Sequence, residues 1–276
     1  MQEGKTGFMQ GRRPVVSGKR GGRVGRLDGR VAVVTGAGRG IGAAEAVRLA
    51  QDGANVAVFD LTEEACRETV EAVEAVGSEA LAVACDVSKA DQVDAGFAKV
   101  AERFGRVDIL INNAGVLRDN LSFKMSEEDW DTVLDVHLNG SFLCSRAAQK
   151  YMVEQEYGKI VMTSSIVALG NKGQVNYSSA KAGLQAMART LALELGRFGI
   201  NVNAVAPGWI ETEMTKEAAE RVGMTMDDMK ERFAKNIPLR RFGRVDDIAN
   251  VIAFLVSDDA SYISGETIYV AGGPSS

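Results

Sequence analysis

The chain of 276 residues has little of several residue types that particular protein classes require. Its one histidine, His137, argues against zinc sites built on several histidines and leaves a Ser-His-Asp triad a single candidate base. Its three cysteines form no C-x-x-C pair, so we expect no disulfide framework. This cysteine content fits a protein of the reducing cytoplasm. Only four prolines are present, and no apolar run approaches the roughly 20 residues of a membrane helix. We therefore expect a cytoplasmic protein with no metal site and no membrane partner.

Charge is spread unevenly along the chain. The net charge is −5, yet residues 1–30 hold eight Lys and Arg against two Asp and Glu. The acidic remainder makes nucleic acid an unexpected partner. Residues 1–27 lack apolar periodicity and are predicted to be a disordered basic extension, the alternative being a nucleic-acid-binding or targeting arm. Arg12-Arg13 is not followed by the roughly 7–15 apolar residues of a secretion signal.

Short apolar segments alternate with longer amphipathic ones from residue 30 onward. This alternation predicts an α/β fold: one doubly wound, Rossmann-type domain over residues 28–276, with a seven-stranded parallel sheet and helices on both faces. The least regular part, 208–238, is Met-rich and resembles a mobile lid. Strands are expected at 31–34, 55–59, 80–84, 107–111, 159–162, 200–204 and 267–270. Helices are expected at 43–52, 62–76, 91–104, 127–153, 177–198 and 245–256.

A glycine-rich loop joins the first expected strand to the first helix. It reads Thr-Gly-Ala-Gly-Arg-Gly-Ile-Gly over residues 35–42. Glycine lets backbone N–H groups approach a pyrophosphate, and the helix N-terminus adds positive potential. The spacing is G-x₃-G-x-G and differs from the G-x-G-x-x-G fingerprint. The loop's place between strand and helix nevertheless predicts a dinucleotide site.

An acidic residue ends the second expected strand. Asp60 lies eighteen residues after Gly42, where a carboxylate can accept both ribose hydroxyls of an adenosine. It would also repel a 2′-phosphate, which favours NAD over NADP. Arg39 in the loop could instead welcome that phosphate, so NADP remains the alternative cofactor.

Two further strand ends carry candidate binding residues. Asp86 and Val87 end the third strand, and Asn112–Gly115 end the fourth. The carboxyl ends of parallel strands line the crevice where ligands bind. Asp86 could accept from an adenine amino group while Val87 packs beside the ring.

Three residues form a candidate reactive group. Tyr177 and Lys181 are four apart and share one helix face, and Ser164 lies thirteen residues before the tyrosine. A phenol titrates near 10, and a nearby ammonium or a positive nicotinamide ring would lower its pKa. Tyr177 could then act as general acid/base on an alcohol or carbonyl oxygen to which Ser164 donates a hydrogen bond. Hydride would pass between the substrate carbon and the nicotinamide.

With these pieces the chain resembles the short-chain dehydrogenase/reductase family over residues 28–272. It is most similar to the 3-oxoacyl-(acyl-carrier-protein) reductase branch, which implies fatty acid metabolism and a homotetramer. The matching pieces are Thr35–Gly42, Asp86-Val87, Asn112–Gly115, Ser164, Tyr177, Lys181, Pro207-Gly208, 208–214 and 264–272. The resemblance implies cofactor contacts from Gly36, Arg39, Gly40, Ile41, Gly42, Asp60, Leu61, Asp86, Val87, Asn113, Ala114, Gly115, Tyr177, Lys181, Ile210 and Thr212, the last two at the nicotinamide carboxamide.

The chain departs from the family at one catalytic position. Members usually carry an asparagine seven residues after the tryptophan that is Trp130 here, and this chain has His137. Asn139 comes two residues too late to share that helix face. The family's asparagine holds a proton-relay water, which an imidazole titrating near pH 7 could also do. The alternative is that His137 only packs.

These patterns predict an NAD(P)-dependent oxidoreductase that acts on a secondary alcohol or ketone. A 3-oxoacyl or 3-hydroxyacyl thioester is the favoured substrate, with a steroid, sugar or other small alcohol as the alternative. A non-catalytic nucleotide-binding protein on the same scaffold is the competing class. An apolar substrate group is suggested by lid residues that could equally form the lid's own packing face: Met214, Met224, Met226, Met229 and Phe233.

Overall fold

The parallel sheet lies at the centre of the molecule. The computed structural model describes residues 25–274 except residue 222. Within them, seven strands pair in the order β3-β2-β1-β4-β5-β6-β7, and every pairing is parallel. The order reverses direction between β1 and β4, which places a crevice at their carboxyl ends. The strands are β1 Val31–Thr35, β2 Asn55–Asp60, β3 Ala80–Ala84, β4 Ile109–Asn112, β5 Gly158–Thr163, β6 Ile200–Pro207 and β7 Thr267–Val270.

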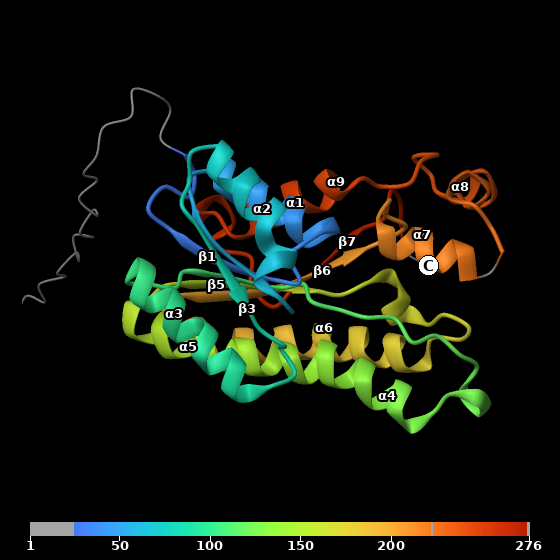
Figure 1. Ribbon diagram of the computed structural model, residues 1–276, viewed down its shortest axis with the longest axis horizontal. Helices are drawn as coiled ribbons and strands as arrows, with labels where there is room; N and C mark the ends of the chain where they lie inside the picture. Colours follow the sequence, from blue (N-terminus) through green and yellow to red (C-terminus); the bar gives the residue numbers. More distant parts are fainter. Residues whose placement is uncertain (1–24, 222, 275–276) are drawn as a thin grey trace, which may run out of the picture.

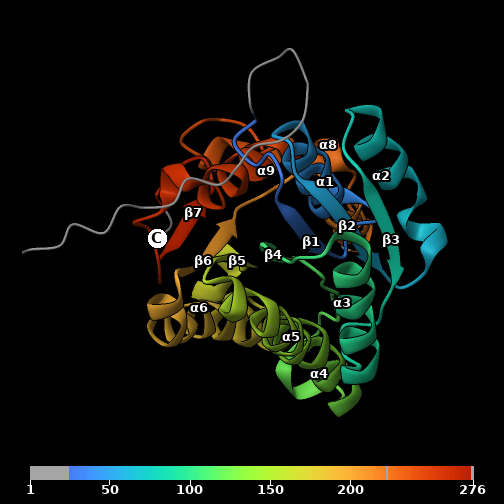
Figure 2. The same cartoon turned by 90° about the vertical axis from the view of Figure 1, so that its left-hand side faces the viewer.

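Helices cover both faces of this sheet (Figures 1 and 2). One face carries α1 Gly40–Gln51, α2 Glu63–Ala75 and α9 Val245–Leu255. The other carries α3 Ala90–Phe104, α4 Glu127–Leu134, α5 Gly140–Gln155 and α6 Val175–Leu195. Two short helices, α7 Glu213–Arg221 and α8 Met226–Phe233, lie beyond the sheet at the right of Figure 1. The predicted single doubly wound domain is confirmed.

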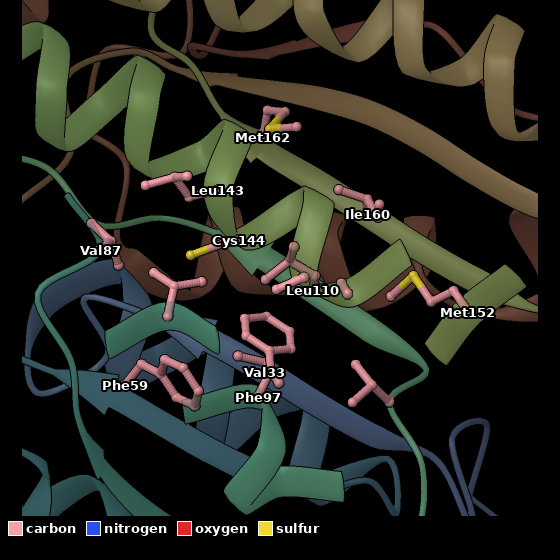
Figure 3. Close-up of a cluster of buried hydrophobic side chains, with 14 of the residues drawn as sticks. Val33, Phe59, Val87, Phe97, Leu110, Leu143, Cys144, Met152, Ile160 and Met162 are labelled. Atoms are coloured by element: carbon pink, nitrogen blue, oxygen red, sulfur yellow. The ribbon is translucent and has the colours of Figure 1, made fainter. Parts of the chain in front are cut away.

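Strand alternation divides the core into two clusters. Val33 of β1 faces the α3, α5 and α6 side, whereas Ala32 and Val34 face the α1, α2 and α9 side. All five residues of β1 are buried, as expected for a central parallel strand. In the first cluster the rings of Phe59 and Phe97 meet edge to face at 5.6 Å between centroids (Figure 3). The two clusters pack on opposite faces of the sheet, beneath the strand ends that form the site.

The expected helix 127–153 is not a regular α-helix. A π-helical turn, Asp135–Asn139, separates α4 from α5, and it contains His137. A π turn inserts an extra residue per turn and re-aims its side chains, which period-3.6 reasoning cannot anticipate. The expected start of the next helix at 177 is also two residues late, because α6 begins at Val175.

The folded domain includes residues that were assigned to the basic extension. Leu27 is buried in the cluster beneath α1 and α9, so the predicted boundary at residue 27 is wrong for Gly25–Leu27. The rest of that predicted extension lies outside the described residues. None of the described helices is both long and apolar enough to cross a membrane.

Candidate active site

The strand ends open into a cavity of about 660 Å³. It is bordered by the ends of β1 to β6, the start of α6 and the segment leading into α7. Every cofactor-contact residue expected from the sequence lines it except Gly42: Gly36, Arg39, Gly40, Ile41, Asp60, Leu61, Asp86, Val87, Asn113, Ala114, Gly115, Tyr177, Lys181, Ile210 and Thr212. Thr163, Ser165 and Thr215 also line the cavity and were missed.

The glycine loop has the shape its sequence predicts. Gly36 and Gly40 have φ of +60° and +63°, a left-handed conformation that favours glycine. A Cβ on Gly36 would lie 2.7 Å from the Ala114 Cα, so a side chain cannot fit between the loop and β4. A Cβ on Gly40 would meet no described atom within 4 Å, which leaves open space for a ligand. The loop therefore fits a dinucleotide pyrophosphate.

Two residues expected to contact the cofactor also shape the glycine loop. The Asn113 side-chain amide donates to the carbonyl oxygens of Thr35 and Gly36, both at 3.0 Å. Gly42 is buried, and a Cβ there would lie 2.4 Å from the Asn113 Nδ2 and from the Gly36 oxygen. Gly42 therefore does not line the described cavity, and its missing side chain leaves room for Asn113 and for the Gly36 carbonyl.

Asp60 presents a carboxylate fixed by backbone donors. Its Oδ2 accepts from the Gly38 amide at 2.9 Å, and its Oδ1 accepts from the Leu61 amide at 2.8 Å. Each carboxylate oxygen keeps a further lone pair for a ribose hydroxyl. Arg39 lies 3.7 Å from Glu217 of α7, so its guanidinium is drawn toward the lid.

Tyr177 and Lys181 project from the first turns of α6 into the cavity. The Lys181 Nζ donates to the Thr163 carbonyl oxygen at 2.6 Å and lies 5.3 Å from the centroid of the Tyr177 ring. Burial lowers the pKa of Lys181 to about 7, while the charge of Glu45 opposes that fall. The helical spacing therefore places the two groups together as predicted.

The expected lowering of the tyrosine pKa is not found. Burial raises the pKa of Tyr177, the charge of Asp119 raises it further, and a hydrogen bond with the Ser165 hydroxyl opposes the rise. A phenolate removed from water is destabilised, and the ammonium of Lys181 carries its own desolvation penalty. The phenol is therefore protonated at neutral pH, which is the form that donates a proton.

The structure distinguishes the two neighbouring serines by their contacts. The Ser164 hydroxyl donates to the Lys181 carbonyl oxygen at 2.8 Å and accepts from the Gln185 amide at 3.0 Å. Ser165 lines the cavity, a hydrogen bond from it opposes the rise of the Tyr177 pKa, and its hydroxyl also caps the turn that follows β5. The structure therefore favours Ser165 as the partner of the phenol, whereas counting thirteen residues back from the tyrosine selects Ser164.

His137 is buried against the phenol. Its ring meets the Tyr177 ring edge to face at 5.1 Å, and its Nε2 lies 2.9 Å from the carbonyl oxygen and 3.0 Å from the amide nitrogen of Val116. Burial, and next the charge of Lys181, hold the pKa of His137 well below its ordinary 6.5. The interpretation that it titrates near pH 7 is therefore corrected: the ring is neutral, with one nitrogen able to donate and the other to accept.

The lid packs mainly on itself. Trp209 stacks on Phe233 and Phe242, with centroid distances of 5.1 and 5.7 Å. Met224, Met226 and Met229 belong to the same cluster. Of the five apolar lid residues singled out from the sequence, Met214 alone lines the described cavity. The packing interpretation is therefore the correct one for the other four.

Comparison with known proteins fits this geometry. A sequence model of the family described as Enoyl-(Acyl carrier protein) reductase matches residues 36–275. The chain belongs to the short-chain dehydrogenase/reductase family. As a member, it is an oxidoreductase that acts on CH–OH groups with a nicotinamide cofactor.

Several members of the short-chain dehydrogenase/reductase family are similar over nearly the whole chain. The short-chain reductase protein NovJ of Streptomyces niveus is 46% identical, covering 88% of this chain and 93% of its own. The 3-oxoacyl-(acyl-carrier-protein) reductase FabG of Staphylococcus epidermidis is 45% identical, covering 88% and 97%. Among solved structures, levodione reductase has a TM-score of 0.87 and 36% identity, and the match covers 90% of this chain and 98% of that one. NAD⁺-bound xylitol dehydrogenase has a TM-score of 0.86 and 32% identity, and the match covers 90% of this chain and 99% of that one.

Proposed function

We propose that this protein interconverts a 3-oxoacyl and a 3-hydroxyacyl thioester with NAD(H) as its cofactor. The observation that carries the proposal is the convergence of Ser165, Tyr177 and Lys181 on a cavity that also holds the Asp60 carboxylate. Similarity to the FabG proteins at 45–46% identity supports the thioester. The reactive groups are in place, which opposes a purely nucleotide-binding role.

Asp60 is the basis for choosing NAD. Its carboxylate would accept the ribose hydroxyls and repel a 2′-phosphate. Its two backbone bonds hold it in position, while Arg39, the group that could attract a phosphate, is paired with Glu217. The likeness to NAD⁺-bound xylitol dehydrogenase supports the same choice, with NADP as the alternative.

The protein's own residues would hold the cofactor and move the proton. The bound nicotinamide supplies or accepts a hydride. The amides of the glycine loop would hold the pyrophosphate, Asp86 and Val87 the adenine, and Ile210 and Thr212 the carboxamide.

At the reacting carbon, the neutral phenol of Tyr177 would give its proton to the carbonyl oxygen. Ser165 would donate a hydrogen bond to the same oxygen and stabilise the charge that develops there. Lys181 would stabilise the phenolate left behind. The neutral imidazole of His137, held at Val116, would accept and donate in the path that returns a proton to Tyr177.

A smaller ketone is the second candidate substrate. The likeness to levodione reductase and xylitol dehydrogenase favours it, as does a lid whose methionines mostly pack on Trp209 rather than on the cavity. We also propose a homotetramer in the cytoplasm. Exposed apolar residues on α5 and α6, namely Phe142 and Leu193, support an interface there.

A spectrophotometric comparison tests the proposal. NADH and NADPH are each paired with acetoacetyl-CoA and with a panel of small cyclic ketones and ketoses, and oxidation of the reduced cofactor is followed. We expect the highest kcat/KM with NADH and acetoacetyl-CoA, and a value lower by orders of magnitude with the Tyr177→Phe variant. Faster turnover of a small ketone than of the thioester would replace the substrate assignment, and preference for NADPH would overturn the role of Asp60.

A further inference from the structure

An ion pair joins the glycine loop to the lid, residues 208–238. The Arg39 Nη1 lies 3.7 Å from the Glu217 Oε1. Arg39 is the N-cap residue of α1, and Glu217 lies in the second turn of α7. The glycine loop and the start of α7 both border the cavity. The pair therefore connects two borders of the cavity that belong to distant parts of the sequence.

The first turn of α7 is fixed against the cavity wall. Glu213, Met214 and Thr215 line the cavity. The Thr215 hydroxyl donates to the carbonyl oxygen of Ile210 at 2.7 Å, and Ile210 is a buried residue of the same wall. Glu217 comes four residues after Glu213, so both carboxylates lie on one face of the helix. The bond at Ile210 therefore keeps the face that carries Glu217 beside the cavity.

Arg39 lies at the end of the cavity that holds Asp60. The amide of Gly38, its neighbour in the chain, donates to the Asp60 Oδ2 at 2.9 Å. Arg39, Asp60 and Leu61 all line the cavity. Because Asp60 is the expected acceptor for the ribose hydroxyls, Arg39 stands close to the position that the 2′-phosphate of NADP would take. A guanidinium binds a phosphate through two parallel N–H groups, so the partner of Arg39 bears on the choice between NAD and NADP.

Glu217 competes with that phosphate for the guanidinium. A 2′-phosphate would have to displace Glu217 from Arg39, and it would also meet the negative charge of Glu217 itself. NADH carries a hydroxyl at this position and has no such requirement. The side chains of Arg39 and Glu217 are 73% and 53% exposed, and exposed ion pairs change an equilibrium constant by up to about fivefold. The pair is therefore expected to shift cofactor preference by a measurable but moderate factor.

We propose that Glu217 is a specificity-determining residue for the cofactor: it occupies Arg39 and, together with Asp60, favours NADH over NADPH. The proposal deepens the proposed function and rests on its assignment of a nicotinamide dinucleotide to this cavity. Asp60 acts on the ribose directly from the end of β2, whereas Glu217 acts from the lid through Arg39. Cofactor choice is therefore shared between the sheet and the lid.

Fluorescence titrations with NADH and NADPH test the proposal without turnover. Glu217→Gln keeps the size of the side chain and removes its charge, so Arg39 is released and the Kd for NADPH should fall about three- to fivefold. The Kd for NADH should change little, and the gain with NADPH should shrink at high ionic strength because salt screens exposed charges. Glu220→Gln removes the same charge from another exposed position of α7 and should leave both Kd values unchanged.

A double-mutant cycle separates the ion pair from a general effect of charge. In an Arg39→Gln background, Glu217→Gln should improve NADPH binding far less, because no guanidinium is left to release. An equal improvement with and without Arg39, or no improvement when Arg39 is present, would overturn the proposal. A preference of the unaltered protein for NADPH would refute the choice of NAD(H) in the proposed function, whereas an improvement that requires Arg39 would still support the role of Glu217.

Discussion

The structure favours Ser165 as the donor to the substrate oxygen, whereas sequence spacing favours its neighbour Ser164. In Ser165→Ala the hydrogen bond to the substrate oxygen is lost, and removing one such donor typically costs 10²–10³ in kcat, about 2.7–4 kcal/mol of transition-state stabilisation. Because Ser165 also caps the turn after β5, we expect a small loss of stability as well. Cofactor binding should be little changed.

Ser164→Ala is the matched comparison. This hydroxyl is nearly fully buried and bonds the Lys181 carbonyl oxygen and the Gln185 amide. Its removal leaves buried polar groups unpaired, which costs roughly 1–3 kcal/mol of folding stability. It takes no donor away from the substrate, so kcat should fall far less than in Ser165→Ala.

The assay is steady-state ketone reduction together with thermal unfolding of both variants. We expect Ser165→Ala to lose turnover and Ser164→Ala to lose mainly Tm. The reverse pattern, with turnover lost in Ser164→Ala and kept in Ser165→Ala, would refute the assignment from this structure.

The remaining predictions concern the cofactor and the proton path. Asp60→Ala should weaken NADH binding about tenfold or more and improve NADPH binding, measured by fluorescence titration; an unchanged preference would mean that Asp60 does not bind the ribose. Tyr177→Phe should lower kcat by about 10²–10⁴ with NADH affinity retained, and undiminished turnover would exclude the acid/base role. Because the pKa of His137 lies well below 6.5, His137→Asn should leave the pH–rate profile near pH 6.5 unchanged. If the unaltered protein shows a limb near pH 6.5 that this variant lacks, the ring titrates there and the assignment of a neutral ring is wrong.

Some of the site could be predicted because local chain geometry fixes it. Tyr177 and Lys181 are one helical turn apart, so any helix through them places both on the same face. The glycine loop and Asp60 follow strands whose apolar runs are plain in the sequence, and parallel strands bring their ends to one edge. These features need only the alternation of strands and helices.

Other parts of the site depend on contacts that local patterns do not encode. His137 sits on a π-helical turn, which shifts the helix face that regular spacing predicts. Only one of Ser164 and Ser165 meets the phenol, and which one is decided by the turn that follows β5. Four of the five apolar lid residues pack on Trp209 and its neighbours, a choice made by the folded lid.

The amino-acid order alone determined the doubly wound sheet, the nucleotide loop and the tyrosine–lysine pair, because hydrophobic periodicity and helical spacing are properties of the covalent chain. Tertiary packing alone decided that Glu45, an ordinary-looking acid in a helix, is fully buried. The physical reason is that burial depends on which helices the fold brings to each face of the sheet. Spacing along the sequence does not record that arrangement.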